Sequence, residues 1–218
     1  PERIHVIHNG ADLERFTPDL RGRYREATRA ACGLEPEEVV VLFVGHGFER
    51  KGLGTLIRAL PRLEAAGAPY RVLIVGGGDR PRYERMARRL GVEQRLCFVG
   101  RQDRIEPFYA AADIFCFPSL YDPCANVVLE ALACGLPVIT SATNGSGELL
   151  AEGREGYVID ARDAEVLAAR LVDLFDPARR ARAALAARAL AESRPFTKVA
   201  DEILDLLRRV GGCRKQTG

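Results

Sequence analysis

Two adjacent cations, Arg50 and Lys51, stand where their side chains could bind an anion. They follow a short glycine-containing stretch, 45–49 (GHGFE), between an apolar run and a helical pattern. Positive charge at a helix start opposes the helix dipole and costs ~0.3–1 kcal/mol per charge, whereas the free amides there favour an anion. The pair therefore indicates an anion-binding site. For this stretch alone, solvated surface cations beside Glu49 are the alternative.

A second group of polar residues lies in the stretch 115–141, which has the pattern of a buried strand, a turn-rich loop, a short helix and another strand. Asn126, or a residue just before it, is expected to cap the helix and to leave its first amides free to meet a phosphate. Glu130 lies one turn inside, where it can accept hydrogen bonds from ribose hydroxyls. Alone, Asp122 fits a turn and Glu130 an exposed helix position. Combined with the basic pair, they indicate a phosphate-bearing ligand.

Glycines also follow the next strand, at 76–78, directly before Asp79. Such glycines let a ligand approach the backbone closely, or they form a tight turn in which Asp79 caps the next helix, which is the favoured interpretation. Neither this cluster nor 45–47 completes a dinucleotide fingerprint, because Arg50 and Pro81 stand where the third glycine belongs. No two Asp lie two positions apart, so no metal and no other cofactor is expected. Arginine, lysine and helix amides would have to stabilise the charge of a departing diphosphate.

The composition excludes several classes of protein. A net charge of +2 and an aromatic content of 7% do not indicate nucleic-acid binding. The longest apolar runs are too short to span a bilayer, and no signal peptide opens the chain. The six cysteines form no CxxC pair, so reduced cytosolic thiols are expected rather than disulfides or zinc ligands. Because the first residue is Pro1, the sequence is expected to be a fragment of a longer product.

Strand and helix patterns alternate along the chain, which predicts an α/β fold with a Rossmann-like, doubly wound parallel sheet and C-terminal helices. Predicted strands cover 4–8, 39–44, 71–75, 96–99, 114–117, 138–140 and 156–159; predicted helices cover 21–32, 51–66, 80–90, 105–112, 127–134, 163–175, 177–193 and 197–210. Ligands bind such sheets outside the carboxyl ends of the strands, so the site is expected in the loops that follow them. The Arg-rich helix 21–32 and the Arg/Ala-rich helix 177–193 are expected to carry solvated faces, with a membrane-surface helix as the alternative for the latter.

These features together resemble the retaining glycosyltransferases of family four, which have the GT-B fold. The segment 122–138 is similar to the family's E-x7-E segment, and the spacing most resembles that of lipopolysaccharide-core glucosyltransferases. The matching segments are 122–138 (DPCANVVLEALACGLPV), 44–57 (VGHGFERKGLGTLI) and the interdomain stretch 9–16 (NGADLERF). The likeness covers roughly residues 4 to 210.

The resemblance implies two Rossmann-like domains, of which residues 1–218 would be the C-terminal, nucleotide-sugar-binding one. Within it, 1–20 would be an interdomain segment, 195–210 a C-terminal helix and 211–218 a tail. The N-terminal domain, which would bind the acceptor, is expected upstream of Pro1. The family's acceptor-side catalytic histidine belongs to that domain, so none of His5, His8 and His46 is expected to take its role.

The family's functional residues map onto specific positions. Arg50 and Lys51 would hold the donor diphosphate and, with Asp122 near the hydroxyls of the transferred sugar, form the catalytic set. Glu130 would bind the ribose. The resemblance implies seven further donor-binding residues: Gly47, Gly100, Arg101, Cys124, Ala125, Asn126 and Val127. Of these, Gly100 and Arg101 would lie near the base. Asp122 is one methylene shorter than the family's Glu, and 123–126 (PCAN) replaces its glycine-rich run.

The implied activity is the metal-independent, retaining transfer of a hexose from a nucleotide-sugar, and UDP is the expected nucleotide. The expected acceptor is a cell-envelope glycan or glycolipid, such as those of lipopolysaccharide biosynthesis. The isolated domain is expected to be inactive, because transfer needs both domains closed. A cytoplasmic location with at most peripheral association at the inner face of the cell membrane is expected, without a nucleic-acid partner. One alternative is a non-catalytic nucleotide-binding module of the same fold. The other is a nonhydrolysing sugar-nucleotide epimerase, which would need a different set of catalytic acids, and the sequence shows no such set.

Overall fold

The described residues fold around one parallel sheet of six strands. The computed structural model describes residues 4–67 and 69–213, with side chains described as far as residue 210. The strands, in sequence order, are β1 (Val39–His46), β2 (Tyr70–Gly77), β3 (Leu96–Gly100), β4 (Ile114–Phe117), β5 (Val138–Ser141) and β6 (Gly156–Ile159). Their order across the sheet is β3-β2-β1-β4-β5-β6, and every neighbouring pair is parallel. The doubly wound parallel sheet predicted from the sequence is therefore confirmed.

Continuous apolar runs form the central strands because both faces of the sheet are covered. Residues 40–43 of β1 and 72–74 of β2 are fully buried, and Val41 of β1 pairs with Val72 of β2 and with Ile114 of β4. Strand order reverses between β1 and β4, since one half of the sheet runs from β1 to β3 and the other from β4 to β6. Ligands of such sheets bind at this reversal, outside the carboxyl ends.

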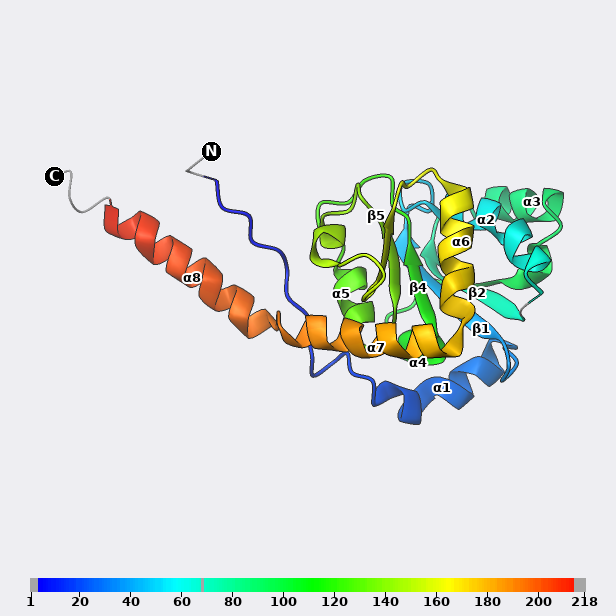
Figure 1. Cartoon of the computed structure of the whole chain (residues 1–218), viewed down its shortest axis with the longest axis horizontal. Coiled ribbons are helices and arrows are strands. Elements are labelled where there is room, and N and C mark those ends of the chain that lie inside the picture. The colour runs from blue at the N-terminus through cyan, green and yellow to red at the C-terminus, as the bar shows by residue number, and fades with distance from the viewer. Residues whose placement is uncertain (1–3, 68, 214–218) are drawn as a thin grey trace.

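Two layers of helices cover the sheet (Figure 1). The helices are α1 (Leu20–Ala31), α2 (Leu53–Ala65), α3 (Arg80–Arg89), α4 (Glu106–Ala111), α5 (Asn126–Ala133), α6 (Ala164–Phe175), α7 (Pro177–Glu192) and α8 (Phe196–Cys213), with short 3-10 turns η1 (Glu93–Arg95) and η2 (Gly145–Leu149). α2 packs against α3 and α6, whereas α1 packs against α4 and α5 against α7. The apolar face of α2 is buried between the sheet and α6, and α7 packs through its small residues Ala183, Ala187 and Ala191.

The prediction of a solvated face for the Arg-rich first helix is wrong. Arg25 and Arg29 of α1 donate to the Asp113 carboxylate at 2.7 and 3.3 Å, and Arg29 is only 5% exposed. Asp113 stands directly before β4 and also accepts a hydrogen bond from the Val40 amide at 2.9 Å. Arginine side chains of α1 therefore fix this helix to the body of the domain. Their partner is 84 or more residues away in the sequence, so helical spacing alone could not identify it.

The predicted strand at 4–8 is also absent. Residues 4–10 form no strand, and Ile4 and Val6 are 77% and 74% exposed. An alternating apolar pattern forms a strand only beside another strand, and the described sheet offers this segment none. Instead, Ala11 forms a bridge with Pro195, and the Arg194 guanidinium donates to the His8 carbonyl at 3.0 Å.

The amphipathic helix α8 extends away from the sheet on the same side as the N-terminal segment (Figure 1). Its large apolar residues Phe196, Ile203, Leu204, Leu207 and Val210 are exposed. Residues 214–218 of the expected tail lie outside the described residues. None of the described helices is long and apolar enough to cross a membrane. The five described cysteines outside α8 carry free thiols.

Candidate functional site

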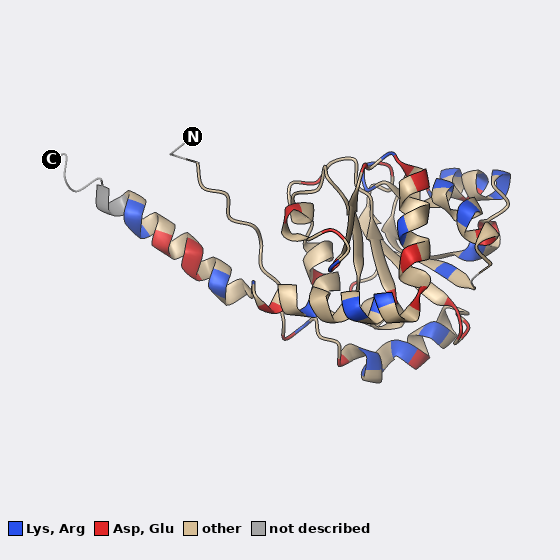
Figure 2. Cartoon of the chain, in the orientation of Figure 1, with Lys and Arg blue, Asp and Glu red and all other residues tan. Residues whose placement is uncertain are grey.

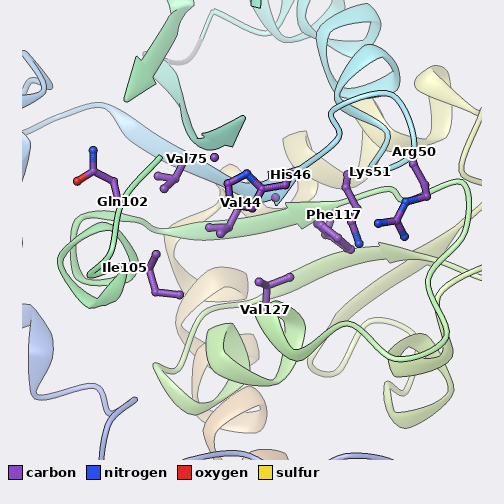
Figure 3. A pocket seen from close by; sticks show the side chains of 11 residues that line it. Val44, His46, Arg50, Lys51, Val75, Gln102, Ile105, Phe117 and Val127 are labelled. Atoms are coloured by element: carbon purple, nitrogen blue, oxygen red, sulfur yellow. The ribbon is translucent and has the colours of Figure 1, made fainter. Parts of the chain in front are cut away.

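A cavity of about 410 Å³ opens at the carboxyl edge of the sheet, where the strand order reverses. Figure 3 shows the residues that line it, which come from the ends of β1, β2 and β4, the loops after β1 and β3, and the first turn of α5. The lining residues are Val44, Gly45, His46, Arg50, Lys51, Val75, Gly76, Gln102, Ile105, Phe117 and Val127. Sequence reasoning predicted the site at this edge, and the cavity opens there.

Glycines let two strand ends approach each other beneath this cavity. Gly76 has φ +126°, and a Cβ atom added to it would lie 2.0 Å from the carbonyl oxygen of Gly45 in β1. The residues after Gly76 serve another purpose, because the Asp79 carboxylate accepts a hydrogen bond from the Arg82 amide at 3.1 Å and caps α3. The favoured interpretation of this cluster, a turn with a capping aspartate, is confirmed. Gly76 in addition forms part of the cavity wall.

The basic pair lies in the turn between β1 and α2, as predicted. Gly52, which follows it, has φ +79°, and a Cβ atom there would lie 1.8 Å from the Pro118 carbonyl oxygen. This close approach fixes the turn against the loop after β4, and the Leu120 amide donates to the Arg50 carbonyl at 2.8 Å. Arg50 is exposed, whereas the side chain of Lys51 is only 13% exposed and its ammonium lies 5.2 Å from the centre of the Phe117 ring.

Lys51 and Asp122 form an ion pair, which sequence reasoning did not foresee. Both side chains are largely buried, and Asp122 is fixed by its backbone, since its amide donates to the Thr143 carbonyl at 3.1 Å and its carbonyl accepts from Gly145. Two of the three predicted catalytic residues are thus in direct contact, and Lys51 lines the cavity. The third, Arg50, reaches the Tyr121 carbonyl at 3.4 Å in the same loop.

The start of α5 leaves its amides open toward the same region. Ala125 occupies the capping position, and no side chain of the residues that the structure describes caps the helix. Asn126 is the first helical residue, and its side-chain oxygen accepts a hydrogen bond from Asn9 at 2.7 Å instead. Buried Asn144 fixes the preceding loop by accepting from the Ala125 amide at 3.3 Å. Of the four loop and helix residues predicted at 124–127, only Val127 lines the cavity.

Glu130 is half-buried one turn further along α5, outside the cavity lining. The hydroxyl of Tyr109, a fully buried residue of α4, lies 2.8 Å from Oε2 of Glu130 and donates to it. Burial raises the pKa of Glu130, and the Tyr109 hydrogen bond opposes that shift. A carboxylate held in this way has a fixed orientation and one oxygen left for another donor.

The remaining predicted residues, Gly47, Gly100 and Arg101, do not line the cavity, although His46 and Gln102 beside them in the chain do. Gly47 has φ +73°, and its amide donates to the Gly77 carbonyl at 2.8 Å. Gly100 ends β3 with φ +84°, and the exposed Arg101 follows it beside Gly77. Sequence reasoning missed their lining neighbours His46, Gln102, Ile105 and Phe117. His46 and Phe117 could have been found by their position at the carboxyl ends of predicted strands, whereas nothing in the local pattern distinguishes Gln102 and Ile105.

The strand order is that of a Rossmann-like domain, and the domain has the fold of one half of a GT-B protein. The family model for "Glycosyl transferases group 1" matches residues 24–189. This chain belongs to that family. The resemblance predicted membership of this family, and the match to the family model confirms the prediction.

Relatives support the assignment across most of the chain. The chain is 36% identical over 219 residues to a D-inositol 3-phosphate glycosyltransferase of Rhodococcus opacus, covering 95% of this chain and 48% of the relative. It superposes on WaaG, a glycosyltransferase involved in lipopolysaccharide biosynthesis, with a TM-score of 0.80 and 28% identity over 94% of this chain and 56% of WaaG. HepE of Anabaena, in complex with UDP-glucose, gives a TM-score of 0.79 with 26% identity over 95% and 58%. The chain therefore spans about half the length of these relatives.

Proposed function

We propose that this chain is the donor-binding half of a metal-independent, retaining glycosyltransferase that transfers a hexose from a UDP-sugar to a cell-envelope glycan or glycolipid. The observation that carries the proposal is a single cavity bordered by Arg50, Lys51 and the uncapped start of α5. Cations and free helix amides that converge on one cavity favour a pyrophosphate. HepE, a relative of similar fold, is known in complex with UDP-glucose.

In this proposal the donor diphosphate lies between the basic pair and α5. Lys51 is largely buried, so its interaction with a phosphate is screened less than at an open surface. Its present partner is Asp122, so an entering diphosphate would share or replace that ion pair. Asp122 would then be available to the sugar hydroxyls. As the nucleotide departs, Arg50, Lys51 and the α5 amides would stabilise the charge that develops on it.

Glu130 would bind the ribose, because Tyr109 fixes one carboxylate oxygen and leaves the other free to accept from a hydroxyl. The base would lie toward Gly100, Arg101 and Gln102 at the end of β3. The acceptor would be bound by the other half of the complete protein. The isolated chain would bind the donor and transfer little, since closure of two domains completes the site. A cytoplasmic location, at most peripherally at the membrane, fits a soluble donor and a lipid-linked acceptor.

Calorimetric titration of UDP tests the proposal. Saturable binding is expected, and the R50A/K51A double variant should lower the affinity at least about tenfold, because each hydrogen bond to a charged group contributes about 1.5–3 kcal/mol. The matched control is R85A/R88A, which removes two exposed arginines of α3 that do not line the cavity. Absence of saturable binding, or equal loss in both double variants, would contradict the proposal.

A second titration separates the two parts of the ligand. Glu130→Gln should weaken UDP binding and leave pyrophosphate binding unchanged, because only the nucleoside carries the ribose. Loss of both to the same extent would show that Glu130 does not recognise the ribose.

A further inference from the structure

A second cavity, of about 560 Å³, lies at the opposite edge of the sheet from the candidate donor site. It opens between α1 and α7, beside Asp113, which precedes β4, and Gly135, which follows α5. Figure 2 shows the arginine-bearing turns of α1 and α7 along this end of the domain. Three arginines line the cavity: Arg21 of α1, and Arg180 and Arg188 of α7. The donor site uses none of them.

Backbone carbonyls hold the three guanidinium groups in place. Arg21 donates through Nη2 to the Ala112 carbonyl after α4 at 2.8 Å, and Arg180 through Nη1 to the Phe175 carbonyl at the end of α6 at 3.0 Å. Arg188 donates through Nη1 to the carbonyl of Ala133, at the end of α5, at 2.7 Å. Each anchored group keeps other N–H donors that reach no acceptor among the described residues. Donors fixed in this way lose little conformational freedom when they bind a ligand.

Positive charge exceeds negative charge around this cavity. Asp113 is the single carboxylate among its described lining residues, and Arg21, Arg25 and Arg29 share it at 3.7, 2.7 and 3.3 Å. Arg188 is paired through Nε with Glu192 of the same helix at 2.7 Å, so its free donors are those of Nη2. Arg180 has no ion-pair partner among the described residues. Burial, together with the neighbouring Arg25 and Arg180 guanidinium groups, lowers the pKa of Arg21. An anion in the cavity would relieve this repulsion.

We propose that the cavity between α1 and α7 binds a phosphate group, carried by a small phosphorylated molecule or by a lipid headgroup. Guanidinium groups bind phosphate oxygens with paired N–H donors, and this cavity presents three such groups from two helices. The other wall is apolar, formed by Ala181, Ala184 and the 76% exposed Leu185. Cations beside an apolar wall suit a phosphate ester, whose carbon part would contact the alanines and Leu185.

Binding of inorganic phosphate tests this site independently of the donor site. The 218-residue chain carrying R50A/K51A, which removes the proposed diphosphate contacts, is titrated with inorganic phosphate at low ionic strength by calorimetry and by amide NMR. Saturable binding is expected, with shifts concentrated at Gly135, Ala181 and Ala184. Adding R21Q/R180Q should lower the affinity at least about tenfold. The matched control, R182Q, removes an exposed arginine of α7 outside the cavity and should leave the affinity unchanged.

A parallel arm distinguishes the two sources of the phosphate group. Vesicles of phosphatidylcholine with phosphatidic acid are compared with phosphatidylcholine vesicles. The site is assigned to a lipid headgroup if vesicle binding needs phosphatidic acid and is lost in R21Q/R180Q while free phosphate does not bind. The site is assigned to soluble ligands if free phosphate binds. The proposal is overturned if neither probe binds saturably, if R182Q matches R21Q/R180Q, or if the shifts scatter over the surface. The NMR arm uses the intact arginines, so misfolding of a variant cannot decide the outcome.

Discussion

The hydrogen bond from Tyr109 to Glu130 gives a prediction about the stability of the fold. Tyr109→Phe removes one hydroxyl from a fully buried ring and keeps its packing against Phe16 and Phe115, whose ring centres lie 5.6 and 5.9 Å away. No cavity larger than an oxygen atom is created, so the loss comes from the two acceptors of the hydroxyl. These are Oε2 of Glu130 at 2.8 Å and, less closely, the Val127 carbonyl at 3.2 Å. A hydrogen bond to an ionised group contributes about 1.5–3 kcal/mol, and this is the expected decrease in the free energy of unfolding.

The size of this decrease should depend on pH. Burial raises the pKa of Glu130 in the folded state above its ordinary value, while the Tyr109 hydroxyl lowers it. Without the hydroxyl the folded-state pKa rises further, so the folded variant holds its proton to a higher pH than the unfolded chain does. The variant is therefore penalised most at pH 8, where Glu130 must be ionised. The penalty shrinks as the pH falls toward the ordinary glutamate pKa, because the carboxyl group then becomes neutral in the folded state.

Urea unfolding of both proteins at pH 8 and pH 5 measures the effect. Tyr83→Phe is the matched control, since Tyr83 is also a buried aromatic residue but its hydroxyl makes no hydrogen bond within the described part of the chain. We expect the control to differ from the parent by less than about 0.5 kcal/mol at either pH. A Tyr109→Phe loss no larger than that of the control, or a loss that grows toward pH 5, would refute the reasoning.

Two further predictions concern stability. Asp113→Ala should lower the free energy of unfolding by about 3–5 kcal/mol, because it leaves the buried Arg29 guanidinium without its carboxylate; a loss below about 1 kcal/mol in urea unfolding would show that the remaining carbonyl contacts suffice. Asp163→Ala should cost about 1 kcal/mol, because the Asp163 carboxylate accepts from the first amides of α6 at 3.0 and 2.9 Å. Asp163→Asn, which retains the acceptor, is its control and should stay near the parent in thermal unfolding.

Local pattern was sufficient for most of the fold. The apolar runs of β1 and β2 and the helical spacing of α2 placed these elements within a few residues of their observed bounds, because burial on both faces of a parallel sheet requires those residue types. The helix starts and strand ends also predicted a site at the edge of the sheet where the cavity opens. The prediction of secondary structure failed where a pattern depended on a distant partner. The alternating residues Ile4 and Val6, for example, have no neighbouring strand among the described residues.

The sequence by itself determined the order of the six sheet strands and of the helices between them, the cationic turn at Arg50 and Lys51, and the family. Only the tertiary structure decided which of these groups meet. Lys51 and Asp122 are 71 positions apart, and the crossover through β2, β3 and β4 is what brings their charges together. The arginines of α1 likewise became buried partners of Asp113 instead of a solvated face. Side-chain contacts of this kind depend on how separate elements pack, and residue spacing carries information only about neighbours within one element.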